Sequence, residues 1–279
     1  MGTCSHCQCS SPYFTAGQNP TDTTMVCVLS ACSQSGELYS GDCVNGFIEK
    51  TICRPEGDVF IGTGLVDMYA KCGHIDSALC TFRLMSVKNV LTWTAMGAGL
   101  ALHGRGKEAL ELLDAMGDFG IKPNPVTFTS LLSACCHAGL VEEGLKLFHN
   151  TRNTIGIEPH IQHYGCIADL LGRAGYINEA NDFIIEMPIR PDAILWRSSL
   201  SACNVHGDLA MAEKVGKILL QLEPPKNSLH VPVTGEDYIA LSNVYASAGR
   251  WRQVEMVRKK MKSKRVETKP GGSFIQTIG

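Results

Sequence analysis

The side chains best suited to chemistry in this sequence are thiols and an imidazole near its N-terminus. Cys4, His6, Cys7 and Cys9 are all potential zinc ligands. A structural zinc site, however, normally uses a second ligand pair at a defined spacing, and none follows nearby. The sequence also has no Walker loop, no Gly-x-Ser-x-Gly and no nucleotide-binding glycine fingerprint. We therefore expect no metal, no cofactor, no small-molecule substrate and no catalysis by this chain.

A second group of reactive side chains is basic and lies toward the C-terminus. Residues 250–269 include nine Lys or Arg and two Glu, a local charge of +7, although the whole chain carries a formal −2. That small negative net charge argues against binding of polyanions over the whole surface. Arg258, Lys259 and Lys260 are candidates for phosphate contacts that do not depend on base sequence. The alternative interpretation is a solvated helix face with a basic tail.

Composition limits the elements that position these residues without choosing among folds. The chain has 279 residues, 44% of them hydrophobic, which is enough for one domain or a short array. Its apolar runs are far shorter than the ~20 residues that span a bilayer, so we expect no membrane partner. The 13 cysteines are scattered singly, which favours a reducing compartment in which most thiols act as small core residues.

An internal repeat is the strongest pattern in the sequence. A helix-like stretch ends in glycine and is followed five residues later by a small residue, as in YAKCGHIDSA at 69–78 and CCHAGLVEEG at 135–144. Glycine suits this place because a helix that must stop commonly ends with one residue in the left-handed conformation. The glycine column contains Gly36, Gly73, Gly104, Gly139, Gly175, Gly207 and Gly249, spaced by 37, 31, 35, 36, 32 and 42 residues.

The second column of the repeat is small because two helices must cross there. Its members are Gly41, Ala78, Ala109, Gly144, Ala180 and Ala212, and Val254 is the one departure. A helix pair of this size cannot bury its apolar face alone, so pairs stack on one another. We predict an all-α fold: a right-handed superhelical solenoid of helix-turn-helix repeats, in the manner of a tetratricopeptide-like α-α superhelix.

The unequal repeat lengths and several phrases resemble plant pentatricopeptide repeat proteins of the PLS subclass. GLVDMYAKCGHIDSA and FTSLLSACCHAGLVEEGLKLF match the repeats, whereas AILWRSSLSACNVHGDLAMAEKVGKILLQLEP resembles that subclass's C-terminal E extension. The resemblance divides the chain into an irregular segment 1–21, repeats over 22–192, an E extension over 193–269 and a tail at 270–279. The individual repeats would be 22–58, 59–89, 90–124, 125–160 and 161–192.

This resemblance implies binding of single-stranded RNA, with one base for each repeat. In the family, the fifth and last residues of a repeat read the base, and here they are Thr63 with Asn89 and Thr94 with Asn124. Threonine with asparagine is similar to the family's adenine-preferring pair, a hydroxyl and an amide being able to donate and accept along a purine edge. We therefore expect two neighbouring adenines to be read.

The family's second repeat position sandwiches the base, and here it contains Phe60, Leu91 and Val126. Without the resemblance, each would be an ordinary residue at the start of a helix. The other repeats carry pairs with no clear base preference, and the spacing departs from the family near residues 52–56 and 227–233. With five units at most, the chain would match too many transcripts to specify one, so we expect it to be truncated or to work with partners.

Many PLS members direct cytidine-to-uridine editing in mitochondria or chloroplasts. The zinc deaminase that performs this reaction needs His-x-Glu and Cys-x-x-Cys, and this sequence has no His-x-Glu. The resemblance thus implies an RNA editing or RNA-processing specificity factor that recruits a deaminase in trans through the E extension. Localisation in either organelle rests on the resemblance, because residues 1–21 form no convincing transit peptide.

Two alternatives remain open at the level of sequence. One is a helical-repeat scaffold that binds proteins and not RNA, because tetratricopeptide arrays stack the same kind of helix pair. The uneven repeat length weighs against it, since that family keeps a uniform 34-residue period. The other is a degenerate fragment without a stable function, which the short array and irregular N-terminus suggest.

Overall fold

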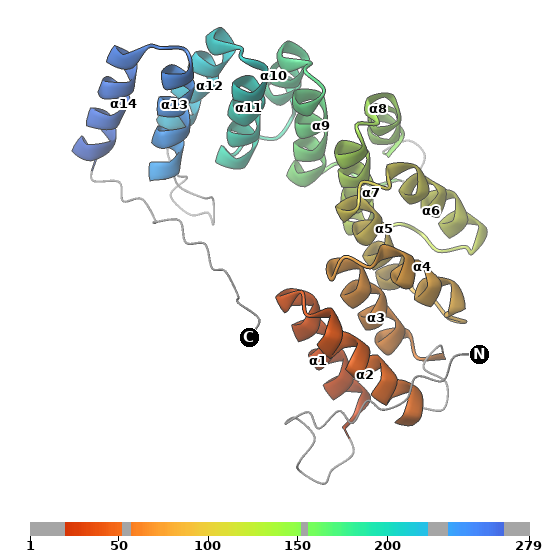
Figure 1. Cartoon of the computed structure of the whole chain (residues 1–279). Coiled ribbons are helices and arrows are strands. Elements are labelled where there is room, and N and C mark those ends of the chain that lie inside the picture. The colour runs from red at the N-terminus through yellow and green to blue at the C-terminus, as the bar shows by residue number, and fades with distance from the viewer. Residues whose placement is uncertain (1–19, 52–56, 152–155, 223–233, 265–279) are drawn as a thin grey trace, which may run out of the picture. The chain divides into compact units, whose positions relative to one another are not determined.

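The computed structural model describes residues 20–51, 57–151, 156–222 and 234–264, and the regular secondary structure across these ranges is helical (Figure 1). The helices fall into two compact units. The first unit contains α1 (Asp22–Ser35), α2 (Leu38–Thr51), α3 (Val59–Lys71), α4 (Ile75–Leu84), α5 (Val90–Leu102), α6 (Gly106–Asp118) and α7 (Pro125–Ala138). The second contains α8 (Val141–Asn150), α9 (Ile161–Arg173), α10 (Ile177–Glu186), α11 (Ala193–His206), α12 (Leu209–Gln221), α13 (Gly235–Ser247) and α14 (Trp251–Ser263).

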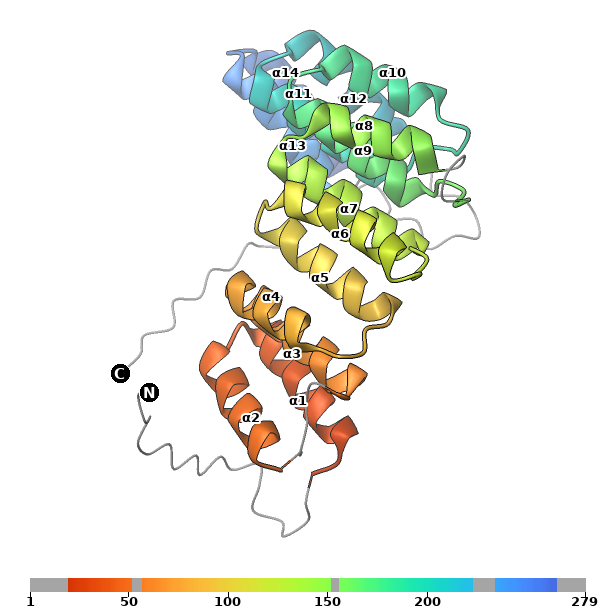
Figure 2. The ribbon, with the colours of Figure 1, turned by 90° about the vertical axis from the view of Figure 1, so that its right-hand side faces the viewer.

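Within each unit the helices pack as consecutive pairs. In the first unit α1, α3, α5 and α7 each contact the next member of that row, and α2, α4 and α6 pack against it as their partners (Figure 2). The second unit repeats the arrangement with α9, α11 and α13 in one row and with α10, α12 and α14 as partners. The predicted all-α architecture of stacked helix pairs is confirmed.

The helices begin and end where their capping chemistry places them. Side-chain oxygens of Asp58, Asn89, Asn124 and Asp192 accept backbone N–H groups in the first turn of α3, α5, α7 and α11, which satisfies donors that the helix cannot pair. At the other ends, every glycine of the predicted column has a positive φ, between 66° and 92°. The prediction that this column stops helices is confirmed.

The small column lies buried between helices, as predicted. Ala78, Ala109 and Ala212 have no exposed surface, and Ala180 is 2% exposed. Val254, the departure from the pattern, is also buried, in the last helix. At Gly41 a β-carbon would collide with the side chain of Met68 on α3, so the size limit arises from the neighbouring helix pair and not from the helix itself.

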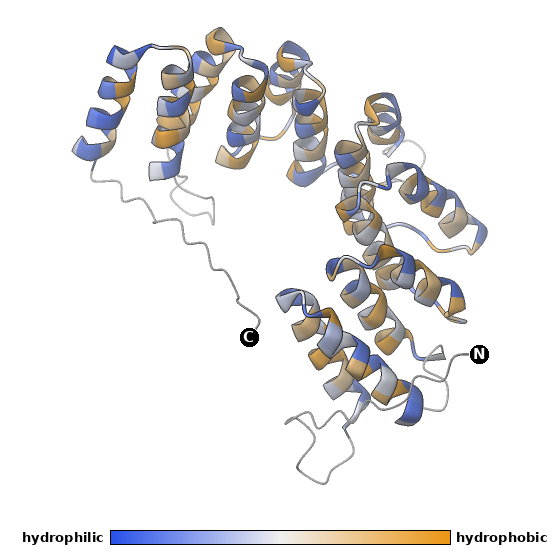
Figure 3. Ribbon diagram, in the orientation of Figure 1, coloured by the Kyte–Doolittle hydropathy of each residue, from blue (hydrophilic) through white to orange (hydrophobic). Residues whose placement is uncertain are grey.

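Each unit has its own apolar core between the helix rows (Figure 3). Around α1 to α3 the core is built from Met25, Leu29, Val44, Ile48, Ile61, Leu65 and Met68. In the second unit it includes Ile184, Trp196, Leu200, Leu219, Leu241 and Tyr245. Helix α8 joins this unit through Phe148, whose ring lies 5.2 Å from that of Tyr164 and 5.5 Å from that of Phe183.

Several predicted features lie outside the described residues. They are the thiol and imidazole group at Cys4, His6, Cys7 and Cys9, the irregular spacing at 52–56 and 227–233, the end of the basic segment at 265–269 and the tail at 270–279. Within the described ranges, no cluster of His, Cys, Asp or Glu is placed to hold a metal ion. None of the helices described is both long and apolar enough to span a bilayer.

Candidate nucleic-acid interface

The predicted base-reading residues lie at the junctions between consecutive helix pairs of the first unit. Thr63 is in the second turn of α3, and Asn89 is the residue that caps the N-terminus of α5. Thr94 and Asn124 occupy the same places on α5 and before α7. Because α3 packs on α5 and α5 packs on α7, each threonine faces the start of the next helix in the row.

Capping fixes the orientation of the two asparagine amides. The Asn89 Oδ1 atom accepts the backbone N–H groups of Leu91 and Thr92, both at 3.0 Å, and the Thr92 hydroxyl at 3.1 Å. The Asn124 Oδ1 atom accepts the N–H of Thr127 at 2.8 Å and its hydroxyl at 3.0 Å. The amide oxygen is therefore occupied, and the Nδ2 group is the part of each side chain that can meet a ligand.

This arrangement assigns a direction to the amide of each predicted pair. The sequence predicts that the hydroxyl and the amide together donate and accept along a purine edge. Only the oxygen of the side-chain amide can accept hydrogen bonds from backbone N–H groups, so that oxygen must point toward the helix. The amide then faces the groove as a donor alone. Among the described residues, neither Asn89 nor Asn124 uses its Nδ2 group in a hydrogen bond.

Each predicted pair is bridged by a threonine that the sequence reasoning missed. The Thr63 and Thr92 Oγ1 atoms lie 2.7 Å apart, and the Thr94 and Thr127 Oγ1 atoms 2.6 Å apart. Thr92 and Thr127 are the third residues of α5 and α7 and are 0% and 1% exposed. The signal was present as Asn-x-x-Thr in NVLT at 89–92 and NPVT at 124–127, a variant of the reciprocal capping pattern.

A groove joins the predicted reading and stacking residues of the first pair. Its volume is about 290 Å³, and it is lined by Val26, Ser30, Phe60, Thr63, Gly64, Asp67, Asn89, Leu91 and Ala95. Phe60 is 66% exposed and Leu91 is 56% exposed, so both apolar side chains are available to a ligand. This volume lies just below the ~300–1,000 Å³ of pockets for drug-sized ligands. A single flat aromatic ring is smaller than such a ligand, so the groove suits it.

The second predicted position has the same components one helix pair further on. Val126 occupies the place on α7 that Leu91 occupies on α5, two residues after the capping asparagine, and it is 62% exposed. Phe60 likewise follows its cap, Asp58, by two residues. The three predicted stacking side chains therefore form one series of exposed apolar residues at helix starts, a position that Ile194 also occupies on α11 at 57% exposure.

The predicted phosphate-contacting residues belong to α14 in the second unit, and all three are exposed. The Arg258 Nε atom donates to the Ser242 hydroxyl on α13 at 3.0 Å. The Lys259 ammonium pairs with Glu255 at 2.7 Å, and this contact lowers the pKa of Glu255. These partners leave the guanidinium and ammonium groups in solvent, where long-range attraction to phosphate remains available.

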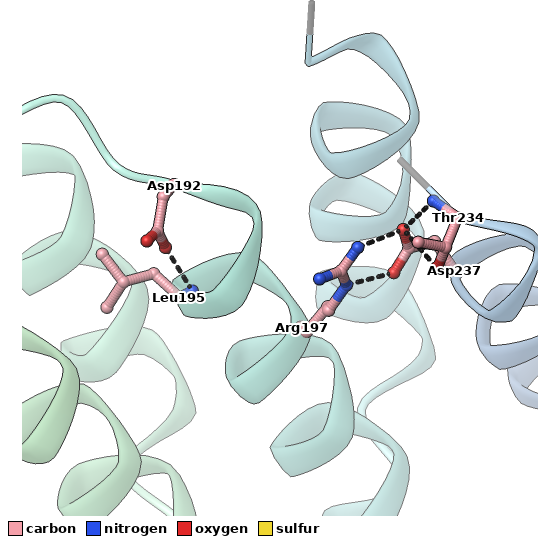
Figure 4. Close-up of polar contacts among 5 residues, drawn as sticks. All are labelled: Asp192, Leu195, Arg197, Thr234 and Asp237. Atoms are coloured by element: carbon pink, nitrogen blue, oxygen red, sulfur yellow. Dashed lines mark hydrogen bonds and ion pairs between the residues drawn. The ribbon is translucent and has the colours of Figure 1, made fainter. Parts of the chain in front are cut away.

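The second unit places charged residues where the first has the threonine bridge (Figure 4). Arg197 follows the α11 cap Asp192 by five residues, as Thr94 follows Asn89. Its Nε and Nη2 atoms donate to the two carboxylate oxygens of Asp237 at 2.5 and 2.8 Å. Asp237 is the third residue of α13 and is 2% exposed.

The Asp237 carboxylate also closes the cap of its own helix. Its Oδ2 atom accepts the Thr234 backbone N–H at 2.7 Å and the Thr234 hydroxyl at 3.3 Å. Hydrogen bonds to Asp237 raise the pKa of the Arg197 guanidinium above its ordinary value. Thr-x-x-Asp at 234–237 is again visible in the sequence, but its partner lies 40 residues away.

Comparisons with known proteins agree with this architecture. The PPR repeat profile matches residues 63–90 and 126–151, a second PPR repeat family profile matches 88–137, and the E motif profile matches 206–276. Among solved structures, the pentatricopeptide repeat protein PPR10 from maize superposes with a TM-score of 0.66 at 20% identity, over 88% of this chain and 35% of PPR10. PPR10 in complex with an 18-nt psaJ RNA element superposes with a TM-score of 0.61 at 17% identity, over 89% of this chain and 41% of that one.

Proteins of similar sequence come from Arabidopsis thaliana. The pentatricopeptide repeat-containing protein At3g18970 is 56% identical over 93% of this chain. The putative chloroplastic protein At5g59200 is 42% identical over 91%, and the mitochondrial protein At3g26782 is 42% identical over 92%. The chain spans 55%, 45% and 37% of these three proteins. By its repeats, its E motif and its helix-pair fold, the chain belongs to the pentatricopeptide repeat proteins of plants.

Proposed function

We propose that this chain binds single-stranded RNA and selects bases at the α3–α5 and α5–α7 junctions. The observation that carries the proposal is the groove, because it brings the predicted stacking pair Phe60 and Leu91 together with the predicted reading pair Thr63 and Asn89. Unstacked bases are recognised in this way, with aromatic or apolar contact to the ring and hydrogen bonds to its Watson–Crick edge.

Adenine fits the donors and acceptors that the groove presents. Its N1 atom is an acceptor for the Asn89 Nδ2 group, and its exocyclic amino group is a donor for the Thr63 oxygen. Thr94 and Asn124 offer the same pair at the next junction, where Val126 supplies apolar surface. Two neighbouring adenines are therefore the proposed target of this part of the chain. The proposal of RNA as the ligand is supported by the structurally similar PPR10, which was solved in complex with an RNA element.

In the cell, the proposed role is that of a specificity factor for organellar cytidine-to-uridine editing or another RNA-processing step. The E motif at residues 206–276 supports a function of this class, and the names of two similar proteins place them in chloroplasts and mitochondria. The deaminase would be supplied from outside this chain, because the sequence contains no His-x-Glu. The proposed partners are thus single-stranded RNA and a deaminase or other editing factor.

Titration with short labelled RNAs tests the binding proposal. The oligonucleotides differ only at two adjacent central positions, which are AA, GG, CC or UU. We expect the wild type to prefer AA. Changing Asn89 and Asn124 to Asp should move the preference toward GG, because a carboxylate can accept the N–H groups of guanine but cannot donate to adenine. The loss on the AA oligonucleotide should be roughly 1–3 kcal/mol for each base contact.

This double variant is a clean probe because aspartate caps helices as well as asparagine does. The chain itself uses Asp58 and Asp192 in the same role, so α5 and α7 should keep their N-termini. If the folded wild type binds none of the four oligonucleotides, or if both proteins select the same bases, the proposal fails. The protein-binding scaffold would then be the better interpretation of the array.

A further inference from the structure

Thr92 and Thr127 are buried, yet each is hydrogen-bonded to both predicted reading residues of its junction. The Thr92 hydroxyl lies 2.7 Å from that of Thr63 and 3.1 Å from the Asn89 Oδ1 atom. The Thr127 hydroxyl lies 2.6 Å from that of Thr94 and 3.0 Å from the Asn124 Oδ1 atom. With 0% and 1% of their surface exposed, neither threonine can touch RNA itself.

The number of hydroxyl protons at the first junction determines which donors and acceptors face a base in the groove. A hydroxyl has one proton, and the Asn89 oxygen can only accept, so Thr92 donates to Asn89. Thr63 must then donate its own proton to the Thr92 oxygen, because two hydroxyl oxygens 2.7 Å apart need one proton between them. Toward the groove, Thr63 retains lone pairs only, whereas Asn89 presents N–H groups only.

The second junction reaches the same polarity with an additional acceptor. Thr94 Oγ1 lies 2.7 Å from the carbonyl oxygen of Val90, one turn back on its own helix, and can donate to it in place of Thr127. Whether its proton goes to Val90 or to Thr127, none remains for a base. At the first junction no such carbonyl contact is present for Thr63 within the described residues, so its polarity depends on Thr92 alone.

In the second unit too, the third residue of the following helix is hydrogen-bonded to the fifth-position side chain. There Asp237 occupies the place of Thr92, and it holds Arg197 through two hydrogen bonds. In the second unit the Asp237 carboxylate orients the Arg197 guanidinium. In the first unit the Thr92 hydroxyl orients the Thr63 hydroxyl. In both units the buried residue determines which atoms of the fifth-position residue are free to face a ligand.

We propose that Thr92 and Thr127 are positioning residues for base choice, which fix the fifth-position hydroxyl as an acceptor beside the amide donor that the capped helix orients. The inference rests on the proposed RNA binding and extends it to residues that touch no RNA. Without Thr92, the Thr63 proton is released and can be donated to a base. Adenine and guanine edges then become comparable partners for the first junction, while stacking on Phe60 and Leu91 is unchanged.

The test compares single variants on the same four oligonucleotides and on the mixed pairs AG and GA. Thr92→Val keeps the side-chain shape and removes the hydroxyl. We expect its preference for A over G at the first junction to fall about 5- to 10-fold, as expected for one hydrogen bond, with the second junction unchanged as an internal control. Thr127→Val should have a smaller effect because Val90 still holds the Thr94 proton.

Controls separate base choice from folding. Thr92→Ser restores the hydroxyl and should restore the preference. Thr81→Val removes a threonine hydroxyl that is bonded only to the Ser77 carbonyl on α4, and it should leave selectivity intact. If Thr92→Val lowers the melting temperature too far for binding assays, Thr92→Ala removes the hydroxyl without placing a methyl group against Asn89.

The outcomes distinguish this inference from the proposed function. A wild type that selects AA together with a Thr92→Val protein of equal selectivity would overturn the positioning role and leave RNA binding standing. Equal losses in the Thr92→Ser and Thr92→Val proteins would also contradict it, since the effect would then follow packing and not the hydroxyl. A wild type without any base preference would overturn both.

Discussion

The α3–α5 and α5–α7 junctions of the first unit and the α11–α13 junction of the second use the same three positions for different chemistry. In the first unit a half-buried threonine, a buried threonine and a capping asparagine form a neutral bridge beside an open groove. In the second, Arg197, Asp237 and Thr234 occupy those positions as an ion pair that closes a helix cap (Figure 4). The helix-pair scaffold is the same in both regions. The side chains determine whether the hydrogen-bonding groups of a junction remain open to a ligand or are paired with one another.

This difference separates two demands on a repeat protein. A neutral hydroxyl and amide cost little to leave facing solvent, so their free lone pairs and N–H groups remain available to a ligand. A carboxylate that is 2% exposed must stay paired, because an unpaired buried charge is expensive. Loss of either partner at the Arg197–Asp237 junction is therefore expected to destabilise the fold, whereas the first-unit junctions are expected to contribute selectivity.

The largest expected effect is on stability in the second unit. Arg197→Met should lower the free energy of unfolding by roughly 3 kcal/mol, because it leaves Asp237 buried without its cation. The partial exposure of Arg197, 28% of its side chain, keeps this value at the lower end. Thr63→Val, the equivalent change in the first unit, should cost about 1 kcal/mol or less. Urea denaturation followed by circular dichroism measures both, and equal losses would erase the proposed distinction.

The next-largest expected effect is on thermal stability. It should be equal in the two units because helices in both units end at residues of the glycine column. Gly139 and Gly207 have φ values of 69° and 73°, and at either residue a β-carbon would have no neighbouring atom within 4 Å. A valine at either site would be strained by its backbone alone, at a cost of roughly 1–3 kcal/mol. Thermal melts of Gly139→Val and Gly207→Val should therefore shift downward together.

Gly117 provides the matched control for the glycine column. It is the second-last residue of α6, with a helical backbone and equally open surroundings, so Gly117→Ala should stabilise the protein slightly, by at most about 0.5 kcal/mol. Unchanged melting temperatures in both valine variants would mean that the left-handed stop is not required in either unit.

A smaller effect concerns affinity that does not depend on base sequence. Replacing Arg258, Lys259 and Lys260 with Gln should reduce the slope of log affinity against log salt by at most about 2, at ~0.7 for each phosphate contact with a single strand. Lys214→Gln on α12 serves as the control, since it removes a charge outside the basic segment. An unaltered slope in the triple variant would identify α14 as a solvated face.

The sequence alone predicts those features that depend on local backbone and packing rules. The glycine column has positive φ throughout, and the small column is buried, because a helix stop and a helix crossing each restrict one residue type strongly. The places of Phe60, Leu91 and Val126 as exposed residues at helix starts also agree with the frame of the repeat. Their contact with RNA stays a prediction.

The hydrogen bonds between consecutive helix pairs could not be predicted from the sequence in the same way. Thr63 and Thr92 are 29 residues apart, and Arg197 and Asp237 are 40 apart, so each bridge depends on how one helix pair stacks on the next. The polarity of the Asn89 amide follows from backbone N–H groups that carry no sequence signature of their own. In the second unit, irregular spacing around 227–233 hides the register that places Asp237 beside Arg197.

The most direct test of the contrast between the two regions is selection from a randomised RNA pool by two matched variants. Asn89→Asp alters the cap of an open junction, and Thr234→Asn alters the cap of the ion-paired junction; both new residues are good helix caps. We predict that Asn89→Asp exchanges adenine for guanine at one position of the selected motif, whereas Thr234→Asn returns the wild-type motif. A motif changed by Thr234→Asn as strongly as by Asn89→Asp, or changed by neither while RNA is still bound, would contradict the account.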